Sequence, residues 1–405
     1  MRWIGLGLVA LVTVCGCAGG KRGGSSFGDD LAFLKEHTDV VVLSDRTGGA
    51  KVAVVPAMQG RVMTSAADGD AGASFGWINR ELIASGKRMQ HINAYGGEDR
   101  FWLGPEGGQF AVYFAKGVPF DLEHWFVPAP LDTEPFDVVE KAPDRIRLGR
   151  TFSLVNHSGT KFDVAVAREV RLLASGDAWK HLGAEPVDGV RMVAYESVNR
   201  ITNAGKEPWK KETGLLSIWI LGMFNPSPAT TIVVPIKAGP ASELGKPVVD
   251  DYFGKVPADR LVVKEGVAYF SGDGKCRSKI GIGPKRCKGI LGSYDATNKV
   301  LTLARFTFDP ARTDYVNSLW KMQDDPYGGD VANSYNDGPP KPGVKPMGPF
   351  YELESSSPAA ALGPGESLQH VHCTVHIAGP EEKLDAIARA TLGVGIQDIV
   401  KAIPH

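Results

Sequence analysis

The residues best suited to acid/base chemistry in this 405-residue chain lie near its C-terminal end, between Asp324 and His376. Glu352 and Glu354 flank Leu353, so in a strand both carboxylates leave the same face, with Cα atoms roughly 6.6 Å apart. Two like charges at that range raise one pKa, which makes one carboxyl a proton carrier near neutral pH. The spacing therefore predicts catalytic glutamates, unless both are the solvated face of an antiparallel sheet.

A row of histidines follows the glutamates. Residues 369–377 alternate between apolar and polar, which places His370, His372 and His376 on one face of a strand. His372 is a candidate catalytic residue, and the His370-x-His372 spacing suits two ligands of a Zn²⁺ or Fe²⁺ site that a nearby glutamate would complete. The alternative is an exposed sheet face, and the sequence leaves the presence and type of a metal open.

A run of oxygen donors interrupted by glycines precedes these strands, on a segment expected to be a loop. Its members could bind the hydroxyl groups of a substrate, or Ca²⁺, although their spacing does not fit the EF-hand pattern. Asx-rich loops also commonly cap their own turns. The candidate substrate-binding residues here are Asp330, Asn333, Tyr335, Asn336 and Asp337, and no cofactor beyond Ca²⁺ is suggested.

Two earlier stretches combine polar groups with aromatic planes. Arg100 could hold a carboxylate or adjacent hydroxyls through two hydrogen bonds, and Trp102 could stack on a sugar face. Glu106 follows in the same glycine-rich stretch, and His124 and Trp125 repeat the mixture. We interpret these five as substrate-binding residues, with a structural Arg-Glu pair and core tryptophans as the alternative.

The first residues read as a targeting segment. Residues 1–16 hold one basic residue, Arg2, and an apolar run too short to remain in a membrane, as in a secretory signal. The small residue before Cys17 resembles a bacterial lipoprotein signal, which implies lipidation of Cys17; Ala18 implies the outer membrane, facing the periplasm. A plain cleaved signal is the alternative. Residues 17–27 form a Gly/Ser-rich tether, which leaves 28–405 as a single domain.

The other cysteines would then lie in an oxidising compartment. Cys276 and Cys287 bracket a short basic segment, so we expect a disulfide that closes a hairpin. Cys373 falls on the apolar face of its predicted strand and is expected to be a small buried residue.

The charge balance limits the partners. The chain has 45 Lys and Arg against 46 Asp and Glu, which argues against nucleic acid and against a polybasic membrane surface. We expect a small neutral ligand and membrane contact through the lipid anchor alone; the oligomeric state stays open.

Strand signals dominate the remaining pattern. Short β-branched runs separated by turns recur from Phe110 to Tyr315, served by 49 Gly and 27 Pro. Short helices are predicted over Asp29–Glu36 and Ile78–Ser85, the latter ended by Gly86, and a C-terminal helix or pair over Glu381–Ile403. This pattern predicts an all-β fold, a large antiparallel β-sandwich with short peripheral helices.

Several segments together resemble the galactose mutarotase-like (aldose 1-epimerase-like) superfamily and its bacterial lipoprotein relatives of unassigned function. In chain order they are KVAVVPAMQGRVMTSA, NAYGGEDRFWLGPEGGQFAVYF, ESVNRITNAGKEPW and YELESSSPAAALGPGES. The resemblance implies a β-supersandwich in which Glu354 takes the proton from an anomeric hydroxyl while a histidine protonates the ring oxygen. That histidine has no counterpart in GLLSIWILGMFNP or GGEDRFW.

The sequence therefore favours a carbohydrate-binding periplasmic lipoprotein with epimerase-like chemistry centred on Glu354. One alternative is a glycoside hydrolase or lyase that acts on a polysaccharide through Glu352 and Glu354. Another is a non-catalytic scaffold protein of the envelope.

Overall fold

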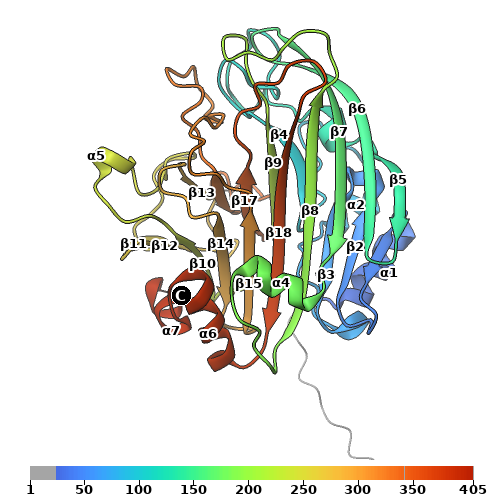
Figure 1. Cartoon of the computed structure of the whole chain (residues 1–405), viewed down its shortest axis with the longest axis vertical. Helices are drawn as coiled ribbons and strands as arrows, with labels where there is room; N and C mark the ends of the chain where they lie inside the picture. Colours follow the sequence, from blue (N-terminus) through green and yellow to red (C-terminus); the bar gives the residue numbers. More distant parts are fainter. Residues whose placement is uncertain (1–23, 342, 405) are drawn as a thin grey trace, which may run out of the picture.

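The structure is a computed structural model that describes residues 24–341 and 343–404. Antiparallel sheets make up most of it, with short helices at the periphery (Figure 1). The predicted all-β sandwich is therefore confirmed. The predicted signal (1–16) and the lipidated Cys17 lie outside the described residues.

A ten-stranded sheet forms one layer of the sandwich. Strand β18 (Ser367–Ala378) lies inside it, paired along its length with β8 (Arg191–Asn203) and along residues 372–378 with β15 (Val300–Phe306). The remaining strands, from one edge to the other, are β11 (Leu261–Lys264), β12 (Val267–Ser271), β10 (Thr230–Pro235) and β14 (Ile290–Asp295) before β15, and β7 (Lys161–Leu172), β6 (Arg145–Val155) and β5 (Asp137–Ala142) after β8.

A five-stranded sheet forms the second layer, and it carries most of the residues predicted to act. Its strands in order are β13 (Ser278–Ile282), β16 (Ala332–Asn336), β17 (Tyr351–Ser356), β9 (Ser217–Phe224) and β4 (Arg100–Gly104). Inward side chains such as Leu353 and Ile280 pack against Phe270 and Leu291 of the large sheet. A third sheet contains β1 (Val41–Ser44), β2 (Lys51–Val55) and β3 (Arg61–Ala66).

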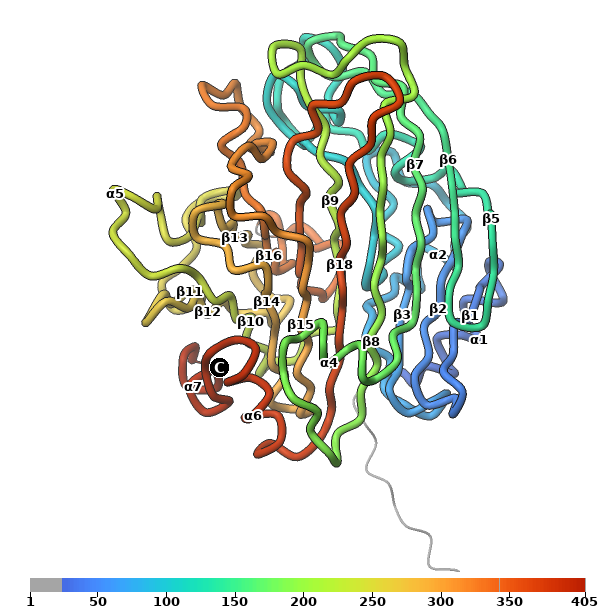
Figure 2. Tube along the Cα trace, in the orientation of Figure 1, coloured from blue at the N-terminus to red at the C-terminus, as the bar shows by residue number. Residues whose placement is uncertain are grey.

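Helices cover the edges and one outer face. The C-terminal pair α6 (Glu381–Leu392) and α7 (Ile396–Ala402) packs with α4 (Ser175–Leu182) against Cys373, Val375 and Ile377 of β18 (Figure 2). The other helices are α1 (Phe27–His37), α2 (Arg80–Ser85), α3 (Ala129–Asp132), α5 (Ala241–Leu244) and the short 3₁₀ turns Pro56–Met58 and Gly69–Ala71. No helix in the described part of the chain is long and apolar enough to span a membrane.

Local sequence signals account for several helix ends. Ser26 and Asp29 form a reciprocal capping box at the start of α1. Gly86 ends α2 with a φ of 60°, a left-handed conformation that glycine adopts without a Cβ clash. Since Ser26 also pairs with Ala73, the end of the predicted tether is already part of the fold.

The predicted Cys276–Cys287 disulfide is wrong, because both residues are free thiols. The intervening segment is not a hairpin but includes strand β13, five residues long. At about 3.3 Å per residue, that strand alone spans roughly 16 Å, whereas a disulfide needs Cα atoms within about 7 Å. Cys373 is buried, as expected.

Candidate functional site

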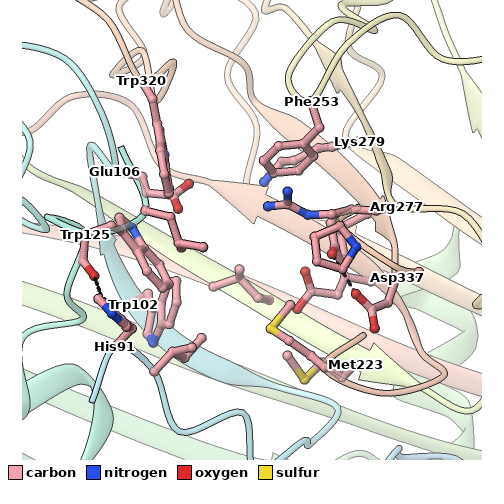
Figure 3. A pocket seen from close by; sticks show the side chains of 18 of the residues that line it. His91, Trp102, Glu106, Trp125, Met223, Phe253, Arg277, Lys279, Trp320 and Asp337 are labelled. Carbon is pink, nitrogen blue, oxygen red and sulfur yellow. Dashed lines mark hydrogen bonds between the residues drawn. The ribbon is translucent and has the colours of Figure 1, made fainter. Parts of the chain in front are cut away.

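A cavity of about 590 Å³ opens on the outer face of the five-stranded sheet. Its floor includes Arg100 and Trp102 of β4 and Glu352 of β17. Figure 3 shows two walls across this floor: Trp125, Trp320 and Glu106 line one, and Phe253, Arg277 and Lys279 line the other. The floor of the cavity therefore consists of strand residues whose side chains point to the same face of the sheet, and loops form its rim.

Glu352 lies on the floor with 6% of its surface exposed. Burial raises its pKa to about 8, against the opposing effect of Arg100 and with a smaller contribution from Glu354. Arg100 donates a hydrogen bond from Nη2 to Glu352 Oε1 at 3.0 Å. Near neutral pH this carboxyl therefore carries a proton, for which burial is a larger cause than the neighbouring glutamate.

Glu354 occupies a different environment, although its side chain leaves the same face of β17. It is fully buried and accepts hydrogen bonds from Trp219 Nε1 at 2.9 Å and Lys279 Nζ at 3.0 Å. The structure does not place Glu354 among the residues that line the cavity, whereas both of its partners line it. Glu354 thus fixes Trp219 and Lys279 from beneath.

Lys279 is the cation of this buried pair. Burial alone would lower its pKa, but Glu354, Glu106 and Glu352 raise it overall. It lies 4.8 Å from the centre of the Trp219 ring, a distance at which the ring also favours the charged amine. Lys279 therefore stays protonated at neutral pH.

Two other carboxyls line the cavity. Burial raises the pKa of Glu106, on the wall of Trp320. Burial also raises the pKa of Asp337, although Tyr335 donates its hydroxyl to it at 2.7 Å and Gly348 donates its backbone N–H at 2.9 Å. Both were predicted substrate-binding residues, and both lie where a ligand in the cavity would meet them.

Aromatic rings supply the apolar surface of the site. Trp102 and Trp219 meet edge to face with centroids 5.5 Å apart, and Trp125 stacks on Trp320 at 5.7 Å. The Arg100 guanidinium lies 4.2 Å from the centre of the Trp102 ring. Within the described residues, the buried Nε1 of Trp125 has no hydrogen-bond partner, so a ligand could accept from it.

His91 is the histidine of this cavity, and sequence reasoning missed it. Its Nδ1 lies 2.6 Å from the carbonyl oxygen of Trp125 (Figure 3). Because a carbonyl only accepts, Nδ1 is the donor, so in the neutral ring Nε2 is the basic nitrogen. No motif signals His91; it reaches the cavity through the fold.

Lys279, Arg277 and Trp219 were also missed. The first two lie in the segment interpreted as a disulfide hairpin. The third belongs to SIWILGMF, in which Trp219, Leu221 and Met223 alternate and share the cavity face. That alternation was the available signal.

The histidine row lies elsewhere. His370 and His372 are fully buried between the sheets, where each ring lies 2.8 Å from the hydroxyl of Ser355. The exposed-face interpretation is therefore wrong, and His372 is on the opposite side of β17 from the cavity, because Ser355 faces inward where Glu354 faces outward. The described residues contain no cluster of His, Cys, Asp or Glu suited to hold a metal ion.

The run of oxygen donors is divided. Residues 332–336 form strand β16 rather than a loop, so Tyr335 and Asp337 line the cavity. Asn336 instead donates inward to the carbonyl of Cys276, and Asp330 accepts from the Tyr252 hydroxyl. Asn333, beside Tyr252, and His124, paired with Asp121, do not line the cavity.

The antiparallel sheets have the fold of a galactose mutarotase-like β-sandwich. A protein from Escherichia coli K12 described as a candidate aldose 1-epimerase superposes with a TM-score of 0.50 at 13% identity, over 84% of this chain and 99% of its own. A galactose mutarotase-like protein from Lactobacillus casei gives 0.47 at 10%, over 84% and 100%. At 13% identity the first of these likenesses shows the fold alone.

The particular family is defined more narrowly. Residues 25–403 match the model of a family of unknown function, DUF6786, and the chain belongs to that family. No protein with a curated description matches it.

Proposed function

We propose that this chain binds a carbohydrate in the cavity and transfers a proton on it. A sugar ring presents a flat C–H face and a rim of hydroxyls, and the cavity offers tryptophan planes beside charged donors and acceptors. Its volume of about 590 Å³ falls within the range of roughly 300 to 1,000 Å³ usual for small-molecule sites.

The observation that carries the proton-transfer step is Glu352. Its protonated carboxyl lines the cavity and can act as a general acid near neutral pH. Arg100 stabilises the carboxylate that remains after the proton has left. His91 lines the same cavity and uses Nδ1 as a donor to the Trp125 carbonyl, so its Nε2 is the basic partner in this proposal.

Interconversion of sugar anomers, as in aldose epimerases, needs this combination of acid and base. A hydrolase that uses Glu352 and Glu354 is less well supported, because the two glutamates leave one strand and Glu354 does not line the cavity. Non-catalytic sugar binding is the second candidate; it is favoured by the ion pair that occupies Glu354.

The test uses the full-length protein in detergent and a panel of mono- and disaccharides. Binding is measured from the shift in melting temperature, and exchange between anomers from NMR. We expect Glu352→Gln to bind within about threefold of the wild type and to lose roughly 10²- to 10⁴-fold in exchange rate. Glu382→Gln, an exposed change on α6, serves as the matched control.

The outcomes separate the candidates. Equal exchange rates in the wild type and Glu352→Gln would remove Glu352 from the mechanism. Binding without exchange in the wild type would establish the non-catalytic candidate.

We further propose that the protein is a lipoprotein, anchored through Cys17 in the outer membrane and facing the periplasm. The apolar segment and the small residue before Cys17 support this proposal. Mass spectrometry of the mature N-terminus should find acyl chains on Cys17, and Cys17→Ala should release the protein from the membrane fraction. An unmodified N-terminus would point to a plain cleaved signal.

A further inference from the structure

The two walls of the cavity differ in charge. In Figure 3, Glu106 lies with Trp125 and Trp320 on one side, and Arg277 lies with Lys279 and Phe253 on the other. Lys279 is neutralised by Glu354 at 3.0 Å. Arg277 has no such ion pair within the described residues, although its charge acts on Asp337 and opposes the rise that burial causes in the pKa of that carboxyl.

No acidic side chain in the described ranges, 24–341 and 343–404, forms an ion pair with Arg277. Its guanidinium instead lies 3.8 Å from the centre of the Phe253 ring, which holds the group without neutralising it. Asp337 is on the same side of the cavity, but its carboxylate already accepts hydrogen bonds from Tyr335 and Gly348.

Arg100 provides a second, independent sign that the cavity suits a ligand with hydrogen-bond acceptors. It is 3% exposed, and only Nη2 reaches Glu352, which burial keeps protonated near neutral pH. Its Nε and Nη1 are buried and have no hydrogen-bond partner within the described part of the chain. Buried guanidinium donors without an acceptor are costly, so an acceptor on a ligand would relieve this cost.

We propose that the carbohydrate bound here is acidic and that Arg277 pairs with its carboxylate or sulfate group. This inference rests on the proposed sugar-binding function. Arg277 and Glu106 lie on opposite walls, so an anionic group of the ligand is attracted to the wall of Arg277 rather than to the wall of Glu106. The tryptophans on the wall of Glu106 then receive the sugar ring.

The experiment compares matched pairs on the full-length protein by titration calorimetry. The probes are D-galacturonate against D-galactose, D-glucuronate against D-glucose, and galactose 6-sulfate as the arm that separates sulfate from carboxylate. We expect at least one acidic sugar to bind about 10- to 100-fold tighter than its neutral partner, as suits a charge-assisted bidentate contact. This preference should weaken as salt is added.

Arg277→Gln keeps a hydrogen-bonding side chain and removes the charge. It should abolish the preference for the acidic sugar and leave the affinity for the neutral partner within about threefold. Arg312→Gln removes an equally charged but exposed side chain outside the cavity and should change neither affinity.

Three results would overturn the proposal in different ways. Neutral sugars that bind as tightly as their acidic partners would show that the cavity has no acidic specificity. A loss of both affinities in Arg277→Gln would show that Arg277 supports the site without pairing with an anion. Failure of every sugar, acidic and neutral, would instead reject the sugar-binding function on which the inference rests.

Discussion

Glu352 and Glu354 show how two identical side chains on one strand face acquire opposite properties. Glu352 accepts a hydrogen bond from Arg100 and faces the cavity, and burial keeps it protonated near neutral pH. Glu354 meets a lysine and an indole N–H and lies beneath the floor. The two glutamates differ because different side chains surround each carboxyl, not because of their positions along β17.

The raised pKa of Glu352 makes stability depend on pH. Its folded pKa of about 8 exceeds the ordinary value of 4.5, so between these values the folded state binds more protons than the unfolded state. The free energy of unfolding should therefore fall as pH rises through this window, by at most about 1.4 kcal/mol per pH unit. Urea unfolding at pH 5, 6, 7 and 8 measures the slope.

Glu352→Gln lacks this titration, so its unfolding free energy should fall less steeply over the same pH range. Parallel curves for the wild type and the variant would show that Glu352 titrates alike in the folded and unfolded states.

Sequence alternation was enough to place both glutamates on one face. Polar groups beside aromatic rings singled out Arg100, Trp102, Glu106 and Trp125, all of which line the cavity. It could not reveal the coverage of Glu354, because Trp219 and Lys279 come from strands 135 and 75 residues away in the sequence. For the same reason, the sequence did not predict that His91 lines the cavity. Contacts of this range are set by sheet order, which local patterns do not encode.

At the scale of elements, β18 is unusual because its polar face is turned into the sandwich. The apolar face packs on the C-terminal helices, so the histidines occupy the space between the sheets. Period-2 alternation identified the strand but suggested an exposed polar face, because a buried imidazole needs partners, here Ser355, that lie on another strand.

The buried His370 should weaken the fold in acid. Burial, and to a lesser extent His372, lowers its pKa to about 3 from 6.5. Between these values the unfolded state binds more protons, so stability should be lost as pH falls below about 6.5. His370→Asn should flatten this acid limb of the unfolding curve, whereas His124→Asn, on a surface loop, should leave it intact.

If His370→Asn and the wild type lose stability equally between pH 6.5 and 4, a group other than His370 causes the fall in unfolding free energy in acid.

Helices whose ends carry recognisable residues were predicted well. A strand that depends on hydrogen bonds to neighbouring strands was not. The start of α1 and the end of α2 coincide with their capping residues, and the C-terminal helix pair lies within its predicted range. Strand β16 was taken for a loop because its Asn, Ser and Gly-flanked composition is typical of turns. Its donors are satisfied by neighbouring strands instead, as Ser334 is by the carbonyl of Glu352.

At the scale of the whole molecule, Arg168 joins the three sheets. It lies on β7 of the large sheet, donates to Asp99 Oδ1 beside β4 at 2.6 Å, and donates to the Gly60 carbonyl beside β3 at 3.2 Å. Both charged side chains are completely buried. This pair therefore fixes how the layers sit on one another.

Removal of one partner should be costly. Arg168→Met leaves Asp99 as a buried, uncompensated carboxylate, and we expect a loss of about 3 to 5 kcal/mol in unfolding free energy. Arg145→Met breaks a half-exposed pair with Glu140 and should cost far less. Equal losses in the two variants, measured by urea unfolding, would show that the buried pair does not join the sheets.

The position of β18 in the large sheet also has a kinetic consequence. One half of that sheet ends at β8 and the other at β15, and each edge pairs with β18, which is synthesised after both of them. Until residue 378 is available the two halves stay unjoined, with open edges that could pair with other chains. The large sheet is therefore completed late in folding, when β18 pairs with β8 across a long separation in the sequence, 171 residues between His370 and Asn199.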